Sequence, residues 1–348
     1  MRTLDHSYLD NKKEYKSYLI SNNNLIESEY NTEKSVIHLK DCYYKFDCFK
    51  NDEFIIYLYS DIFYNNFKKN VINAYNHEKC NSNNIYINDK LYLWKVNVTN
   101  YLHFIRDGVP VLEDYFINNE YKDSKILIMQ NKDLIPNYVF QFLEHLNFIN
   151  NIIFIDDLCG KSDNIIFKNL CIPIFNNTKK IKFYKDYKIV KKIESLVHNF
   201  KLPNELKFNK IYVSRRTWIR TQNENIGEDN TQKRKLLNED ELVKYLEEKN
   251  YKELFLEDYD FITKLAILNN SKNIVTTYGA GVINFIFTQN INYYILNSPS
   301  YGLNGLIKNI ISIENDISDF NFYAYRSSEK NCKWTINMDG VKNLIDNL

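Results

Sequence analysis

A regular alternation of apolar strands and helices in the second half of the chain constrains the fold most. Short apolar runs predict strands, and the segments between them repeat apolar residues at helical spacing. We expect strands at 211–214, 254–256, 273–277 and 293–296, and helices at 239–250, 261–269 and 282–287. This order is typical of a doubly wound, Rossmann-like parallel sheet. The fold class predicted is therefore α/β.

Two turns of this predicted sheet carry residues suited to phosphate. Residues 271–287, SKNIVTTYGAGVINFIF, indicate a strand, a glycine-bearing turn and an apolar helix, and residues 210–216, KIYVSRR, a strand that ends in two arginines. The carboxyl ends of parallel strands meet at the edge where ligands bind. Gly279 and Gly281 would let backbone N–H groups approach a diphosphate, and an arginine would supply the countercharge. The alternative is an ordinary tight turn, the commoner explanation of any single G-x-G.

The first half predicts a further set of strands and helices. We expect strands at 35–39, 54–59, 91–96, 125–130 and 152–155, and helices at 100–112 and 138–148. The helix from residue 100 should stop before Pro110, which lacks the N–H that an α-helix requires. Within it His103 and Asp107 are four residues apart and share one face. The strand–helix–strand order of 125–155 predicts a parallel unit.

A charge-rich stretch, residues 176–209, is typical of an interdomain connector, with a helix at 188–200 before Leu202-Pro203. We place the boundary near Lys180. The predicted domains are 1–180 and 181–348. The C-terminal helix is free in this scheme to pack back on the first domain.

Composition narrows the classes of function. Lys plus Arg number 45 and Asp plus Glu 44, a balance that argues against a nucleic-acid binder. The sequence has no apolar stretch long enough to cross a bilayer and no secretory signal, so a soluble, cytoplasmic protein is expected. Six scattered cysteines are too few for a disulfide scaffold, and we expect Cys42 and Cys48 to be reduced thiols. Heavy use of Asn, Lys, Ile and Tyr is typical of A+T-rich coding, as in some protists and large DNA viruses.

Four motifs occur in a fixed order: NYLHF at 100–104, IYVSRR at 211–216, KLLNEDELVKYL at 235–246 and IVTTYGAGVINFIF at 274–287. Together they resemble the catalytic domain of glycosyltransferase family 61, which includes the EGF-domain O-GlcNAc transferase and plant xylan xylosyltransferases. The resemblance extends from Asn100 to Pro299. Where the family has His before Gly-Ala-Gly, this chain has Tyr278.

The resemblance implies a GT-B fold, two Rossmann-like domains facing a cleft. Residues 1–180 would be the acceptor-side domain and residues 181–348 the nucleotide-sugar-binding domain. It also implies an inverting, metal-independent transferase without a cofactor. This enzyme would move a sugar from a UDP-sugar to a hydroxyl of a glycan or glycoprotein. UDP-N-acetylglucosamine is the first donor expected and UDP-xylose the second. Nucleic acid and a membrane span are not expected as partners, and a homo-oligomer is left open.

The resemblance also suggests site residues. On the acceptor side His103 would be the base or an acceptor contact, and Asp107 would orient it or be the base itself. The residues expected at the nucleotide sugar are Ser214, Arg215, Arg216, Glu239, Tyr278, Gly279, Ala280, Gly281 and Asn284. Only one of the two arginines should reach the phosphates, because adjacent strand residues face opposite ways, and Arg215 is favoured.

Each assignment has a structural alternative. The arginines could form surface salt bridges, and His103 could be a packed or exposed helix residue. Asn238 and Glu241 form a capping-box pattern at a helix start, which favours a structural role for this turn over a ribose or uracil contact by Glu239. Asn284 would either reach the nucleotide or fix the loop. Trp94 and Tyr101 would either stack on sugar or pack in the core.

Two rival functions remain at this point. An inactive relative that binds glycan or nucleotide without transfer is suggested by Tyr278. A sugar-nucleotide epimerase would require a dinucleotide fingerprint near the N-terminus, and the sequence has none.

Overall fold

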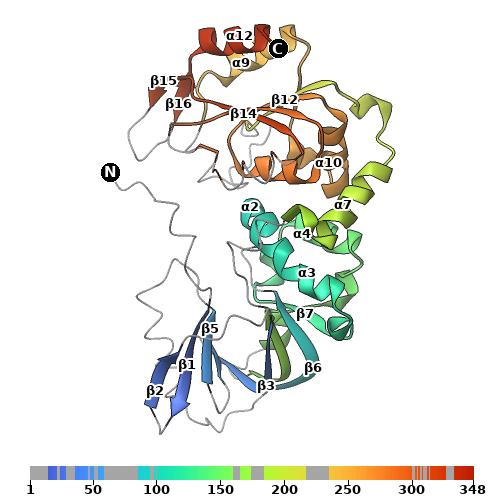
Figure 1. Ribbon diagram of the computed structural model, residues 1–348, viewed down its shortest axis with the longest axis vertical. Coiled ribbons are helices and arrows are strands. Elements are labelled where there is room, and N and C mark those ends of the chain that lie inside the picture. Colours follow the sequence, from blue (N-terminus) through green and yellow to red (C-terminus); the bar gives the residue numbers. More distant parts are fainter. Residues whose placement is uncertain are drawn as a thin grey trace. The chain divides into compact units, whose positions relative to one another are not determined.

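The computed structural model describes the following residues: 15–21, 24–28, 36–45, 48–50, 54–58, 85–94, 98, 100–159, 165–173, 184–216, 235–299, 302–303, 305, 308, 312, 314–326 and 333–348. The chain divides into two compact units, Met1–Val190 and Lys191–Leu348 (Figure 1). The division falls inside helix α7 (Lys188–Asn199), which lies in the expected connector. The polar stretch 217–233 lies outside the described residues.

The first unit contains a mixed nine-stranded sheet in the order β2-β1-β5-β4-β3-β9-β6-β7-β8. Its strands are β1 (Tyr15–Ser21), β2 (Asn24–Ser28), β3 (Val36–Lys45), β4 (Cys48–Lys50), β5 (Phe54–Leu58), β6 (Ile85–Trp94), β7 (Lys125–Ile128), β8 (Ile152–Phe154) and β9 (Ile165–Pro173). Strands β9, β6, β7 and β8 pair in parallel, whereas the pairs from β2 to β9 are antiparallel. The Rossmann-like expectation therefore holds only for the parallel part of this sheet.

The amino-acid pattern explains this mixture. In β3, Leu39 and Cys42 are buried, while His38, Lys40 and Asp41 are exposed. Such an exposed polar face is compatible with an antiparallel sheet that meets water on one side. Strand β7, KILI, is instead a continuous apolar run whose last three residues are buried, as in a parallel sheet covered on both faces.

Cys42 and Cys171 are free thiols.

The helical segment that begins at residue 101 continues through Pro110, so the expected stop there is wrong. It consists of α2 (Tyr101–His103), a π-helical turn η2 (Phe104–Gly108) and α3 (Val109–Ile117). In the π turn the Val109 N–H donates to the Phe104 carbonyl, five residues back. Pro110, which has no N–H to donate, lies in the first turn of α3, a position where helices tolerate proline.

The described part of the first unit contains these further helices: η3 (Asn119–Tyr121), η4 (Lys132–Leu134), α4 (Asn137–His145), η5 (Ile149–Asn151), α5 (Ile155–Cys159) and η6 (Tyr184–Asp186). Helix α4 confirms the helix expected at 138–148.

Strand β6 anchors the segment 101–117 to the sheet. Its side chains alternate, so Leu91 and Leu93 join one apolar core while Tyr92 and Trp94 lie on the opposite face. The Tyr92 hydroxyl donates to the Val111 carbonyl at 2.8 Å, and Trp94 Nε1 donates to the Gly108 carbonyl at 3.0 Å. Trp94 is fully buried, so it is a core residue and not a sugar-stacking surface.

The second unit contains an all-parallel five-stranded sheet in the order β11-β10-β12-β13-β14. Its strands are β10 (Lys210–Val213), β11 (Lys252–Leu254), β12 (Asn273–Thr277), β13 (Asn292–Leu296) and β14 (Asp316–Phe320), and a separate hairpin pairs β15 (Tyr323–Arg326) with β16 (Trp334–Ile336). The helices are η7 (Asn204–Leu206), α9 (Glu239–Glu248), η9 (Leu256–Asp258), α10 (Phe261–Asn270), η10 (Ala280–Phe287) and α12 (Met338–Asp346). The predicted alternation is confirmed, although η10 is a 3-10 helix.

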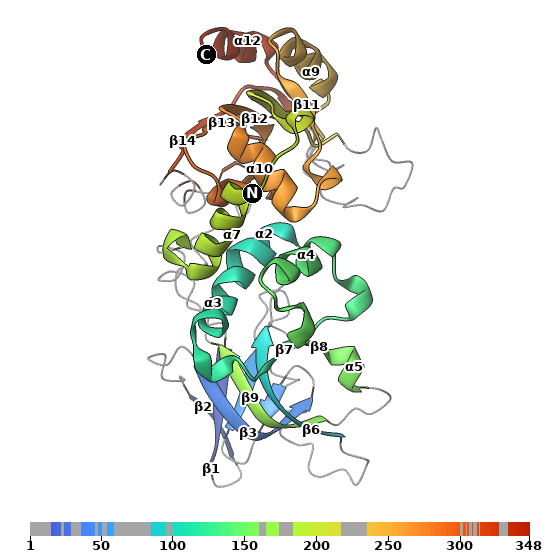
Figure 2. The ribbon, with the colours of Figure 1, turned by 90° about the vertical axis from the view of Figure 1, so that its right-hand side faces the viewer.

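Helices cover both faces of this second sheet. Helices α9 and α12 lie on one face and α10 on the other (Figures 1 and 2). The Tyr245 hydroxyl of α9 donates to Asp346 Oδ1 of α12 at 2.6 Å, and Leu242, Val341 and Val275 belong to the apolar cluster beneath the pair. The C-terminal helix therefore packs on its own unit.

None of the helices in the described ranges combines the length and the apolar character that a membrane span requires.

Candidate functional site

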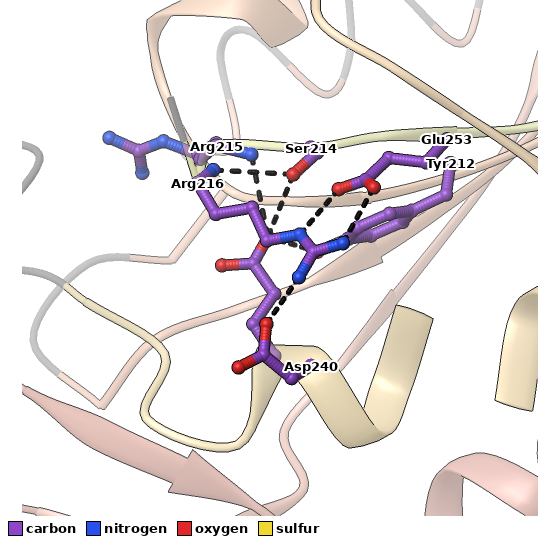
Figure 3. A network of polar contacts seen from close by, with 7 residues as sticks. Tyr212, Ser214, Arg215, Arg216, Asp240 and Glu253 are labelled. Carbon is purple, nitrogen blue, oxygen red and sulfur yellow. Dashed lines mark hydrogen bonds and ion pairs between the residues drawn. The ribbon is translucent and has the colours of Figure 1, made fainter. Parts of the chain in front are cut away.

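The carboxyl end of β10 is held by a polar network (Figure 3). Ser214, the first residue after the strand, is buried, and its N–H donates to the Leu254 carbonyl of β11 at 2.9 Å. The two arginines that follow diverge: the guanidinium of Arg215 points away from that of Arg216 (Figure 3). This is the divergence expected of adjacent residues at a strand end.

Arg215 joins the ends of two neighbouring strands. Its Nη1 donates to the carbonyl of Tyr278, which follows β12, at 2.7 Å. A Cβ placed on Gly279 would lie 2.8 Å from both Cζ and Nη1 of Arg215, so the guanidinium occupies the space that a side chain would need. The backbone φ of Gly279 is −170°, an extended conformation open to any residue. The requirement for glycine at this position is therefore close approach, and the guanidinium and the glycine turn lie side by side as the sequence predicts.

The two loop glycines give a matched test of this packing. A Cβ on Gly281 would meet nothing within 4 Å. Gly281→Ala should therefore be neutral or stabilise the fold by about 0.4–1 kcal/mol, because alanine lowers the conformational entropy of the unfolded chain. Gly279→Ala should instead displace the Arg215 guanidinium and cost about 1 kcal/mol, the worth of the hydrogen bond to Tyr278. Denaturant unfolding of both variants measures the difference. Equal stabilities would contradict the close contact.

The rest of the glycine turn is held by backbone groups and by the Asn284 side chain. The Tyr278 N–H donates to the Leu296 carbonyl of β13 at 2.9 Å. Asn284 is buried, and its Nδ2 donates to the Gly281 carbonyl at 3.0 Å. This contact agrees with the alternative that Asn284 fixes the loop instead of reaching the nucleotide. Ala280 is exposed at the start of η10, next to a half-buried Gly281.

Arg216 is engaged by carboxylates. Its Nε and Nη2 donate to the two carboxylate oxygens of Glu253 on β11 at 2.6 and 2.7 Å, and Nη1 contacts Asp240 in α9 (Figure 3). The bidentate bond to Glu253 raises the pKa of Arg216 further above its already high value. Arg216 thus clamps the end of β10 to β11 and to α9, which agrees with the salt-bridge alternative for this arginine.

Breaking this clamp should destabilise the second unit. The Arg216 and Glu253 side chains are 18% and 13% exposed, so Glu253→Gln neutralises the bidentate carboxylate partner of a largely desolvated guanidinium. We expect a loss of roughly 2–4 kcal/mol in unfolding free energy. The exposed Glu205→Gln, which removes the same charge, should change it by less than about 0.5 kcal/mol. Equal effects of the two variants in denaturant unfolding would refute the clamp.

Glu239 lies under the Arg215 peptide, at the first turn of α9. It is 3% exposed, and its Oε1 accepts from the Tyr212 hydroxyl at 2.7 Å, the Ser214 hydroxyl at 3.3 Å and the Arg215 N–H at 3.4 Å. Burial raises the pKa of Glu239, while these hydrogen bonds oppose that shift. One carboxylate therefore ties α9 to the end of β10.

The expected capping box at the start of α9 is not formed. The Asn238 side chain makes no hydrogen bond to the helix. It pairs instead with Ile336 of β16, donating from Nδ2 to the carbonyl at 2.9 Å and accepting from the N–H at 3.0 Å. A strand close in space but distant in sequence has displaced the local cap.

In the first unit His103 and Asp107 are in contact, as their spacing predicts. His103 Nδ1 lies 2.7 Å from Asp107 Oδ2, and Arg106 binds the same carboxylate through Nε at 2.6 Å and Nη2 at 2.7 Å. Burial acts to raise the pKa of Asp107, but the bonds from His103 and Arg106 outweigh it and hold that pKa below its usual value. Asp107 is therefore ionised at neutral pH and suited to orienting His103 rather than taking a proton.

The contacts of His103 Nδ1 are compatible with a tautomer that leaves Nε2 free. Nδ1 lies 2.7 Å from Asp107 Oδ2 and 2.8 Å from Arg106 Nη2, which itself donates to the same carboxylate oxygen. In the tautomer with its proton on Nδ1, that proton is donated to Asp107 and Nε2 has a free lone pair. Because the His103 side chain is 40% exposed, this nitrogen is able to act as a base.

A model of the family described as Glycosyltransferase 61 matches residues 101–293, more than half of the chain. The chain belongs to glycosyltransferase family 61. No curated protein matches the sequence. The suspected family is thereby confirmed, and membership makes the protein a glycosyltransferase, whose partners are a sugar donor and a glycan acceptor.

All the predicted site residues lie within the family 61 match. In the second unit the structure brings together Ser214, Arg215, Glu239, Tyr278 and Gly279. In the first unit it brings His103 to Asp107. Within the described ranges, no group of three or more His, Cys, Asp or Glu side chains could hold a metal ion.

Four residues of these networks were missed from the sequence, namely Tyr212, Asp240, Glu253 and Arg106. Tyr212 was detectable, because it lies two residues before Ser214 and so shares its face of β10. Arg106 lies three residues after His103, a spacing that also indicates a contact. Glu253 depends on the pairing of Tyr212 with Glu253 between β10 and β11, which the sequence does not reveal.

Proposed function

We propose that this family 61 member is an inverting, metal-independent transferase of GT-B architecture. It would move a sugar from a UDP-sugar to a hydroxyl of a glycan or glycoprotein. The observation that carries the proposal is the contact of the Arg215 guanidinium with the Tyr278–Gly279 turn. The all-parallel sheet of the second unit supports a Rossmann-like nucleotide-binding domain, and the parallel half of the first sheet supports an acceptor-side partner.

The glycine turn and Arg215 together suit a leaving diphosphate. Arg215 brings one positive charge to the ends of β10 and β12, and Ala280 and Gly281 begin a helix whose first N–H groups can bind anionic oxygen. As the bond between the anomeric carbon and the diphosphate oxygen breaks, negative charge grows on that oxygen. Fixed donors stabilise this charge without reorganising, which lowers the barrier.

His103 supplies the base in this proposal. Its Nε2 takes the proton from the acceptor hydroxyl while the acceptor oxygen attacks the anomeric carbon. The electrons of the breaking bond leave with UDP, and one displacement inverts the configuration. Asp107 holds the imidazole in the required tautomer and stabilises the imidazolium that forms.

A donor screen tests this function. The protein should release UDP from UDP-N-acetylglucosamine or, second, UDP-xylose, and UDP should raise its melting temperature because a ligand bound only to the folded state stabilises that state. The activity should persist in excess EDTA. Preference for a guanosine nucleotide sugar, or loss of activity in EDTA that Mn²⁺ restores, would contradict the proposal.

A second candidate function is a nucleotide- or glycan-binding relative without transfer. The observation that favours it is Tyr278, where the family has His. The backbone of Tyr278, not its side chain, makes the contacts with Arg215 and Leu296, so the exchange leaves the Arg215 contact in place. Binding of UDP without turnover of any UDP-sugar would favour this reading, and turnover gained by Tyr278→His would show that the side chain is the cause.

A further inference from the structure

We propose that Glu239 is a positioning residue that acts on the donor diphosphate only through Arg215, together with Tyr212. This inference rests on the proposed function. It differs from a direct ribose or uracil contact by Glu239, the role that the family resemblance suggested.

The geometry of the carboxylate carries the argument. At 3% exposure Glu239 has little surface for a ligand, and its Oε1 already accepts three protein donors. One of these donors is the N–H of Arg215, the residue whose guanidinium lies on Gly279. The carboxylate therefore fixes the peptide from which the Arg215 side chain extends.

Tyr212 holds the carboxylate in turn. The Tyr212 ring is fully buried in β10, and its hydroxyl makes the shortest of the three bonds to Oε1, at 2.7 Å. The buried Tyr212 hydroxyl therefore fixes the position of the Glu239 carboxylate relative to the end of β10. Arg216 restrains the same strand end, because its N–H donates to Ser214 Oγ at 3.2 Å and its guanidinium binds β11.

A double-mutant cycle on UDP affinity tests this route. We expect Glu239→Gln to weaken UDP binding about tenfold, because the neutral amide holds the Arg215 peptide less firmly. Tyr212→Phe should weaken it less, in the same direction. In an Arg215→Ala background both changes should have no further effect, since a residue that acts through Arg215 has nothing left to position. Binding of uridine, which lacks phosphates, should be unchanged in all variants.

The outcomes separate the two proposals. If Arg215→Ala leaves UDP binding intact, the proposed function fails. If Arg215→Ala weakens binding but Glu239→Gln still weakens it in that background, or weakens uridine binding, Glu239 touches the ligand and the inference is overturned. Glu241→Gln, an exposed residue in the same turn of α9, controls for loss of charge and should match the wild type. Thermal unfolding checks that each variant is folded. If Glu239→Gln does not fold, Tyr212→Phe provides the same test.

Discussion

Arg215→Ala is expected to lower kcat/KM for the UDP-sugar by about 100- to 1000-fold, the usual effect of removing one fixed donor to a developing anion. The reason is geometric. Arg215 is the side chain that reaches from the end of β10 to the glycine turn after β12, while Arg216 is committed to Glu253 and Asp240. No other described contact brings a guanidinium to this turn.

Arg215→Lys is the matched variant for this prediction. Lysine keeps the charge but loses the planar fork of the guanidinium, so it should recover only part of the activity. Steady-state kinetics with varied donor, and titration of UDP, measure both variants. Activity of Arg215→Ala within about threefold of the wild type would remove Arg215 from the diphosphate site, because a lost charge-assisted hydrogen bond costs more than that.

His103→Ala is expected to lower kcat by roughly 100- to 10,000-fold, the range for loss of a general base. The affinity for UDP should stay unchanged, because the proposed role of His103 is on the acceptor proton alone. Asp107→Asn should also lower kcat, since an amide facing Nδ1 no longer requires a proton there and Nε2 loses its free lone pair. Burst-free initial rates with saturating donor measure both effects.

The exposed His198→Ala, on α7, controls for the loss of an imidazole and should be fully active. The assignment of the base would fall if His103→Ala kept wild-type kcat. It would also fall if Asp107→Asn lowered kcat far more than His103→Ala does, because the carboxylate would then be the group that takes the proton.

The sequence predicts the second unit well because its elements are set by local patterns. The buried run of β12 and the helical spacing in α9 and α10 need no knowledge of distant residues. The turn at Gly279 was also predictable, because a strand end with glycine in a parallel sheet lies at the ligand edge. That only one of the two arginines faces it follows from the alternation of strand side chains, whereas the choice of Arg215 over Arg216 rested on the family resemblance.

The features that the sequence concealed depend on tertiary contacts. The π turn before Pro110 is held to the sheet by the hydrogen bond that Trp94 of β6 donates to the Gly108 carbonyl. The side chain of Asn238 does not cap α9 because both ends of its amide pair with Ile336. The antiparallel half of the first sheet joins local pairs, such as β3 with β4, to pairs over long sequence distances, such as β3 with β9, and the sequence pattern does not reveal the distant pairs.

The most direct measurement of the central claim is a crystal structure of the protein with UDP. The account predicts diphosphate oxygens within hydrogen-bonding distance of the Arg215 guanidinium and of backbone amides in the Gly279–Gly281 turn. A UDP whose phosphates are bound elsewhere, with Arg215 still closed on the Tyr278 carbonyl alone, would contradict it.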